Sequence, residues 1–139
     1  EVSLRGTAWR SGFFTASLCV IGMQSDYYHH PQRFPKNVSG PFYTLGDQRK
    51  DGSWCGQCLS CETPENEAPT LLAPLTAENA DTYFVRQPQT EAEIEQACCA
   101  VEVCCVDALR YGGRDPTILR RLQGTNCCDL SKRWWEFWK

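Results

Sequence analysis

Ten of the 139 residues are cysteines, and their grouping restricts the fold more than any other feature of the chain. They form one evenly spaced triplet, three adjacent pairs and a single residue: Cys55, Cys58 and Cys61; Cys98-Cys99, Cys104-Cys105 and Cys127-Cys128; and Cys19. Adjacent cysteines rarely bond to each other, because the small ring strains the disulfide geometry. The grouping is therefore unlike a set of disulfides spread out to staple loops together.

The triplet has the spacing C-x2-C-x2-C, which lets three thiolates surround three corners of one cubane iron–sulfur cluster. Gly52 and Gly56 allow the backbone of this loop to approach a cluster closely. A distant cysteine must supply the fourth thiolate, and Cys104 follows a predicted helix. The pattern predicts a single [4Fe-4S] centre.

The same cysteines allow three other interpretations. A thioredoxin-like motif at Cys55 and Cys58 requires a long helix, which Pro64 would interrupt. A zinc site made of four cysteines usually combines two separated C-x2-C pairs, and adjacent cysteines make a poor half-site. An even number of cysteines also permits complete pairing in disulfides, so a disulfide scaffold stays open.

Composition excludes several functions. The net charge is −3 and no basic stripe recurs, which argues against nucleic acid as a partner. The longest apolar run, residues 13–23, is well short of the roughly 20 residues that span a bilayer, so we expect no transmembrane helix. Because the chain starts at Glu1 rather than Met, we expect that a segment, such as a targeting sequence, precedes it.

Strands and helices are expected at five places. The spacer 62–81 is rich in proline, and Pro64, Pro69 and Pro74 forbid a long helix there. Aromatic and β-branched residues or flanking glycines predict three strands, and capping residues predict two helices: strands 41–45, 82–86 and 106–111, and helices 91–103 and 116–123.

The first of these helices carries the clearest signals. Thr90 and Glu93 form a capping box, which fixes its start. An apolar stripe then runs along one face of the helix, with Ile94, Ala97, Cys98, Val101 and Cys105 as its members. The second helix begins with Asp115 as N-cap and Pro116 at the first position, and it ends before Gly124.

Both ends of the chain carry apolar or aromatic segments that are costly to leave in water. Four large aromatic residues crowd the C-terminus: Trp134, Trp135, Phe137 and Trp138. Such a cluster suits a protein interface or a membrane surface, although it could also fold back onto its own domain. We expect residues 11–30 and 132–139 to dock onto other subunits.

Several stretches, taken in order, resemble single-cluster bacterial-type ferredoxins. They are Asn37 to Tyr43, the three-cysteine loop, Val85 to Glu91, and Cys104 followed by Val106-Asp107-Ala108-Leu109. The nearest likeness is to the ferredoxin modules attached to plastid and cyanobacterial metallo-β-lactamase-like proteins. It covers about residues 35–113.

The resemblance implies a small α+β ferredoxin-like domain at 35–113, with an extension at 1–34 and a helix and tail at 114–139. It implies that Cys55, Cys58, Cys61 and Cys104 bind the cluster. This chain has Cys105 where those ferredoxins have proline, so Cys105 is an alternative fourth ligand. No metallo-β-lactamase domain is present, and we expect no enzyme activity.

The expected function is electron transfer within an organellar complex. The plastid character of the resemblance favours algal photosystem I in the chloroplast thylakoid, with a complex of the mitochondrial inner membrane as second choice. The alternative is a structural or assembly subunit that holds no cluster and is stabilised by disulfides. The residues beyond the four ligands keep that alternative open, and their state is not fixed by the sequence: Cys19, Cys98, Cys99, Cys105, Cys127 and Cys128.

Overall fold

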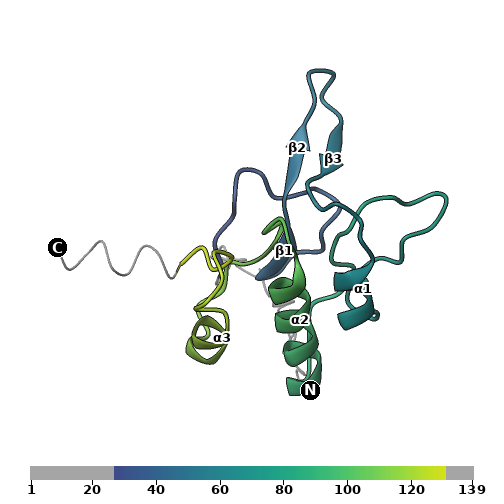
Figure 1. The fold of residues 1–139 in the computed structure, drawn as a ribbon. Coiled ribbons are helices and arrows are strands. Elements are labelled where there is room, and N and C mark those ends of the chain that lie inside the picture. The colour runs from purple at the N-terminus through teal and green to yellow at the C-terminus, as the bar shows by residue number, and fades with distance from the viewer. Residues whose placement is uncertain (1–26, 131–139) are drawn as a thin grey trace, which may run out of the picture.

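The computed structural model describes residues 27–130 and has a small α+β architecture (Figure 1). Four short strands and three helices follow one another in this order: β1 (Phe42–Thr44), β2 (Gly46–Gln48), β3 (Trp54–Gly56), α1 (Thr63–Glu67), α2 (Glu91–Val103), β4 (Leu109–Tyr111) and α3 (Pro116–Arg121). The predicted α+β class is confirmed. A ferredoxin fold as such stays a prediction.

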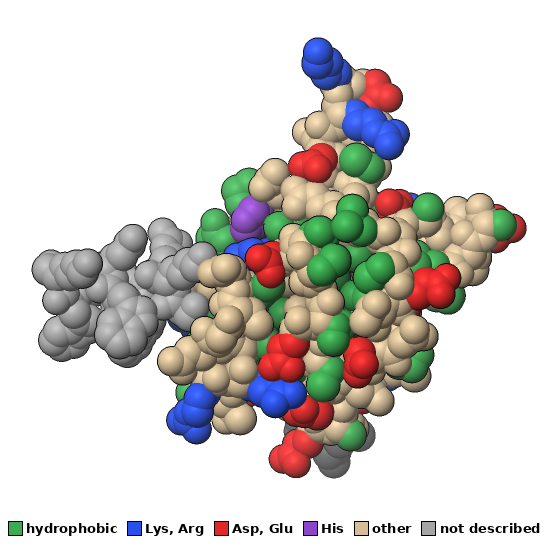
Figure 2. All heavy atoms as spheres, viewed as in Figure 1, with side chains coloured by type: hydrophobic (Ala, Val, Ile, Leu, Met, Phe, Trp, Pro, Cys, Tyr) green, Lys and Arg blue, Asp and Glu red, His purple; other side chains and the backbone are tan. Residues whose placement is uncertain are grey.

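The strands form two separate antiparallel pairs. β1 pairs with β4, and Phe42 lies opposite Tyr111. β2 pairs with β3 in a hairpin, and Asp47 lies opposite Cys55. The hairpin projects from the body of the molecule, as Figure 1 shows. Figure 2 shows basic and acidic side chains at its tip and hydrophobic side chains at its foot.

Leu45 joins the two pairs, because it is the single residue between β1 and β2. Its N–H donates to Ala108 O at 2.8 Å, which extends the pairing with β4. Its carbonyl accepts from Gln57 N at 3.0 Å, which extends the pairing with β3. The chain thus changes partner at Leu45, and this brings the residues before Cys58 close to the residues after Cys104.

One hydrophobic core lies between the β1–β4 pair and the helices. It includes Phe42 and Phe84, whose ring centroids are 5.9 Å apart, and Leu109. The core continues past residue 113, because Ile118 and Leu122 belong to it. It also contains the buried cysteines Cys98, Cys104, Cys127 and Cys128.

The two predicted helices are confirmed, including their starts. The Thr90 hydroxyl accepts from Glu93 N at 3.2 Å, and the Glu93 carboxylate accepts from Gln89 N at 2.7 Å. The Asp115 carboxylate accepts from Thr117 N at 2.8 Å, which caps α3. The Pro-rich spacer forms one short helix, α1, in agreement with the expectation that no long helix forms there.

The predicted strand 82–86 is wrong, because only an isolated bridge joins Phe84 to Leu72. The reason is that a side chain takes the backbone groups that a strand would use. The Asn37 amide accepts from Phe84 N at 3.0 Å and from Thr44 N at 3.1 Å, and it donates to Thr44 O at 2.9 Å. One asparagine thus links β1 to residue 84.

The predicted strand 106–111 begins three residues late, at Leu109. Asp107 has a φ of 53° and its N–H donates to Cys104 O at 3.4 Å, so a turn replaces the first half of the strand. The apolar stripe predicted along α2 also ends before its last expected member, Cys105. Cys105 is exposed, because α2 ends at Val103 and the chain turns there.

Most of the expected docking segments lie outside the described residues: only 27–30 of 11–30 are described, and none of 132–139. Tyr28 N donates to Gly112 O at 2.8 Å, so this end of the N-terminal segment lies against the chain beyond β4. Within residues 27–130, no helix has the length and apolar character needed to cross a membrane.

Candidate metal centre

The three-cysteine loop begins on β3 and runs to the start of α1. Cys55 lies within β3, while Cys58 and Cys61 lie in the connection that follows. Two non-glycine residues of this connection have left-handed backbone conformations, Ser60 with φ 52° and Glu62 with φ 63°. Such conformations are uncommon outside glycine, and they occur most often where a site requires them.

Cys104 occupies the C-cap of α2 and faces Cys58 across the site. Cys58 packs against the hydrophobic core to which the buried Cys104 belongs. The thiols of Cys58 and Cys104 interact, and this interaction lowers the pKa of Cys104 although burial opposes it. The backbone of the following turn, at Val106, Leu109 and Ala108, also lowers this pKa.

The pKa of Cys58 shifts in the opposite direction, because two neighbouring thiols do not both ionise easily. Its hydrogen bond to Cys104 and its burial raise the pKa of Cys58, and bonds from Thr82 and the Ser60 backbone oppose that rise. Two cysteines that are 46 residues apart in the sequence are therefore neighbours in the fold.

The structure brings two of the four predicted ligands together and leaves the others with partners of their own. The Cys55 thiol donates to Asp47 O at 3.7 Å, and the Cys61 thiol donates to Thr63 Oγ1 at 3.5 Å. Cys105 is exposed, whereas its neighbour Cys104 is buried in the core against which Cys58 packs. Among residues 27–130, no three His, Cys, Asp or Glu side chains are arranged to hold a metal ion.

The residues present nevertheless fit a thiolate-bound group. The backbone at Val106, Ala108 and Leu109 lowers the pKa of Cys104, which favours the thiolate form that a cluster ligand needs. The loop backbone takes left-handed conformations at Ser60 and Glu62, on either side of Cys61. Soft thiolates are also the ligands that iron–sulfur clusters use.

Residues 80–82 lie next to the cysteine loop, and the sequence did not indicate this contact. Ser60 Oγ donates to Ala80 O, and Gly56 N donates to the Asp81 carboxylate at 3.2 Å. Thr82 opposes the rise in the pKa of Cys58. Residues 80 and 81 thus hold Ser60 and Gly56, two residues that flank Cys58. Only the polar residues at the end of the spacer could have suggested this contact.

The other described cysteines are structurally distinct from the site. Burial raises the pKa of Cys98 and Cys127 to about 12 and that of Cys128 to about 11. A thiol with such a pKa is a poor nucleophile and metal ligand, because only the thiolate reacts. Cys99 lies on the more exposed face of α2, where Arg121 donates to its sulfur at 3.8 Å. We assign these residues to the core and the helix surface.

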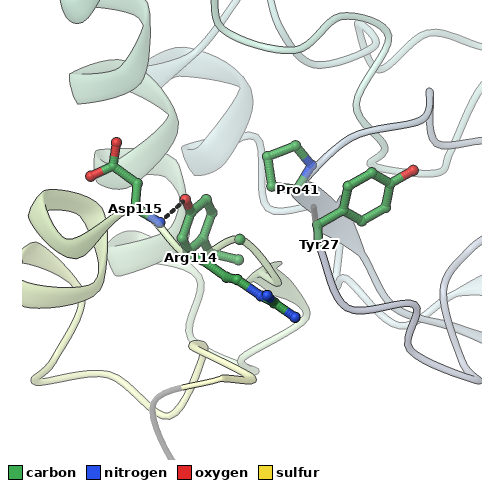
Figure 3. A pocket seen from close by; sticks show the side chains of 6 residues that line it. Tyr27, Pro41, Arg114 and Asp115 are labelled. Carbon is green, nitrogen blue, oxygen red and sulfur yellow. Dashed lines mark hydrogen bonds between the residues drawn. The ribbon is translucent and has the colours of Figure 1, made fainter. Parts of the chain in front are cut away.

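The pocket in Figure 3 is separate from the cysteines. It has a volume of about 390 Å³ and is lined by Tyr27, Pro41, Tyr111, Gly113, Arg114 and Asp115. Tyr27 and Pro41 lie opposite Arg114 and Asp115, and the Tyr111 hydroxyl accepts from Asp115 N at 3.2 Å. No cysteine lines this pocket, so it is not part of the candidate centre.

Comparison of the chain with known protein families, with curated proteins and with solved structures found no match. The contact between Cys58 and Cys104 is therefore the main observation on which a function can be based.

Proposed function

We propose that this chain is an iron–sulfur electron-transfer subunit in which Cys55, Cys58, Cys61 and Cys104 hold one [4Fe-4S] cluster. The observation that carries the proposal is the proximity of Cys58 to the buried Cys104, because Cys58 packs against the core to which Cys104 belongs and the two thiols interact. A ligand pair formed by the loop and the remote cysteine is what the C-x2-C-x2-C pattern requires.

The protein residues have defined tasks in this function. A bound cluster would supply reversible acceptance of one electron. The N–H groups of Val106, Ala108 and Leu109 favour negative charge on the Cys104 sulfur, and the buried position of that sulfur excludes water. Leu59, with 66% of its surface exposed, and Val106, with 40%, present apolar surface next to the ligands Cys58 and Cys104. Apolar surface at a redox centre suits contact with a protein partner.

The host is proposed from the resemblance given above. We infer a membrane-associated electron-transport complex, with photosystem I of an alga first and a complex of the mitochondrial inner membrane second. The terminal segments 11–30 and 132–139 would hold the chain in that complex. No catalytic residue is proposed.

The test is the iron and acid-labile sulfide content of protein purified without oxygen. About four of each per chain would support the proposal, since that is the content of one cubane cluster. The reduced cluster should also give a paramagnetic resonance signal, with bleaching of the visible absorption. Colourless protein that takes up no iron or sulfide, even on reconstitution, would contradict it.

A second candidate is a cluster-free structural subunit, which the same contact also favours. Cys58 and Cys104 could be joined by a disulfide if the disulfide of a partner accepted the two electrons and two protons that their thiols lose. Alkylation followed by peptide mass spectrometry separates the candidates. A Cys58–Cys104 disulfide in iron-free native protein would support the second candidate.

A further inference from the structure

The chain that follows α3 returns to β4 and lies along the edge of β4 that faces away from β1. The Tyr111 N–H donates to Cys127 O at 2.9 Å, and the Asp129 N–H donates to Tyr111 O at 3.1 Å. These two bonds form the parallel bridge between Tyr111 and Cys128. β4 is therefore bonded on both sides, by β1 on one side and by residues 127–129 on the other.

From this segment, the side chain of Cys127 reaches the turn that follows Cys104. Cys127 is fully buried, and its thiol donates to Asp107 Oδ1 at 3.5 Å. Asp107 is the residue of the turn with a φ of 53°, and its N–H donates to Cys104 O at 3.4 Å. Among the described residues, only Cys127 is bonded to the Asp107 carboxylate. The C-terminal segment is thus linked to the turn by one side-chain bond.

The backbone of the same turn is held from the other side by the junction of the two strand pairs. The Leu45 N–H donates to Ala108 O at 2.8 Å. A left-handed conformation is unfavourable for a residue other than glycine, so contacts with the surrounding structure must maintain it at Asp107. The bond from Cys127 is such a contact, and a substitution can remove it without changing the turn itself.

We propose that Cys127 is a positioning residue of the candidate centre, because its thiol holds Asp107 and so fixes the turn that follows Cys104. Cys127 acts through Asp107 and is not a ligand. The centre then depends on a residue from 114–139, the part of the chain expected to be a helix and tail outside the ferredoxin-like domain. The inference deepens the proposed function, and its consequence for a cluster rests on that function. The restraint on the turn concerns the protein alone.

The first test measures amide hydrogen exchange in reduced, cluster-free protein. The Leu45 N–H reports on the turn, because its acceptor is Ala108 O, and the Ala73 N–H, bonded to Tyr83 O at 2.9 Å, reports on opening elsewhere. Cys127→Ala should speed exchange at Leu45 relative to Ala73 by about three- to tenfold, the effect of losing one hydrogen bond. Cys127→Ser keeps a donor and should preserve the native ratio.

Two controls separate this bond from a general loss of packing. Cys98→Ala removes a buried thiol from the same core, at a position on α2 that is not bonded to the turn, and should leave the ratio unchanged. Asp107→Gly keeps the left-handed backbone but removes the carboxylate, so Cys127→Ala should have no further effect in that background. If the alanine variant does not fold, Cys127→Val takes its place, since valine fills the space without a donor.

Three results would overturn the inference. They are an unchanged ratio in Cys127→Ala, an equal change in Cys98→Ala, and a full effect of Cys127→Ala in the Asp107→Gly background. Thermal melts confirm that each variant is folded.

The second test uses cluster-loaded protein and measures the rate at which a chelator removes iron. Cys127→Ala should speed this loss by about threefold or more, whereas Cys127→Ser and Cys98→Ala should behave like the native chain. Faster exchange with unchanged iron loss would overturn the role of Cys127 in the centre. If the native chain forms no cluster, the proposed function fails, whereas hydrogen exchange still decides whether Cys127 fixes the turn.

Discussion

Asp129 holds the last described segment of the chain against the β1–β4 pair. Its carboxylate accepts a hydrogen bond from the Tyr43 hydroxyl. It also accepts two hydrogen bonds from Arg110, from Nη2 at 2.7 Å and from Nε at 2.9 Å. The side chains of Arg110 and Asp129 are only 15% and 5% exposed. Burial and the bond to Asp129 raise the pKa of Tyr43, so the phenol stays protonated as the donor. Removing the carboxylate would leave a buried guanidinium and a buried hydroxyl without their acceptor.

Asp129→Ala should therefore lower the free energy of unfolding by about 3–5 kcal/mol, the usual loss when one partner of a buried ion pair is removed. The matched control is Glu102→Ala, which removes an exposed partner of Arg121 and should cost about 1 kcal/mol or less. Urea unfolding of both variants checks the difference. Equal losses would show that the Asp129 network contributes no more than a surface pair.

Cys104 and Cys105 provide a residue-scale test of the proposed centre. Cys104→Ser should lose most of the bound iron, because the buried sulfur facing Cys58 is removed. Cys105→Ser should keep the iron, since that thiol is exposed and lies beyond the helix. Iron content per chain, measured on both variants, is the readout. Loss of iron from Cys105→Ser alone would transfer the ligand role to Cys105.

At the scale of elements, the start of α2 is the best defined. Arg86 bonds to Glu93 at 2.5 Å, and the Gln89 backbone also donates to this carboxylate; together they lower the pKa of Glu93 to about 2. A depressed carboxyl pKa stabilises the folded state above the pKa of the unfolded chain and ceases to do so as the pH falls through the folded value.

The stabilisation by Glu93 should therefore be constant at neutral pH and disappear as the pH falls from about 4.5 to about 2. Melting temperatures of the native chain and of Glu93→Gln, measured across this range, should converge at its acidic end. Glu91→Gln is the control for a first-turn carboxylate outside the capping box. A difference between native and Glu93→Gln that persists at the acidic end would contradict the assignment.

The two capped helices were predictable from the sequence, whereas the β2–β3 hairpin and the backbone course near Phe84 were not. The caps Thr90 and Asp115 act within their own helices, so α2 and α3 could be predicted from the sequence. The backbone near Phe84 is bonded to Asn37 instead of to a strand, and no local pattern contains that information. The candidate site divides in the same way. The triplet spacing pointed to Cys58 and the predicted end of α2 to Cys104, whereas the bonds of Ser60 and Gly56 to residues 80 and 81 depend on the folded spacer.

At the scale of the whole molecule, the proposed docking depends on segments at the two ends of the chain. Deleting residues 132–139 should release the chain from its complex, because the aromatic side chains proposed to bind the host are removed. The deletion should leave the iron content unchanged, since none of the proposed ligands lies in that segment. Co-purification with the host complex and iron content are the two measurements. Retained co-purification would assign docking to another surface.

The change of partner at Leu45 has a consequence for how the molecule folds. The hairpin of β2 and β3 is local and can form early, whereas β1 must wait for β4, which lies near the other end of the described chain. The Leu45 bond to Ala108 forms as β4 aligns, only four residues beyond Cys104. We therefore expect the pairing of β1 with β4 and the approach of Cys104 to Cys58 to occur in the same step of folding. During synthesis, the thiols of the loop stay without their remote partner until β4 has left the ribosome.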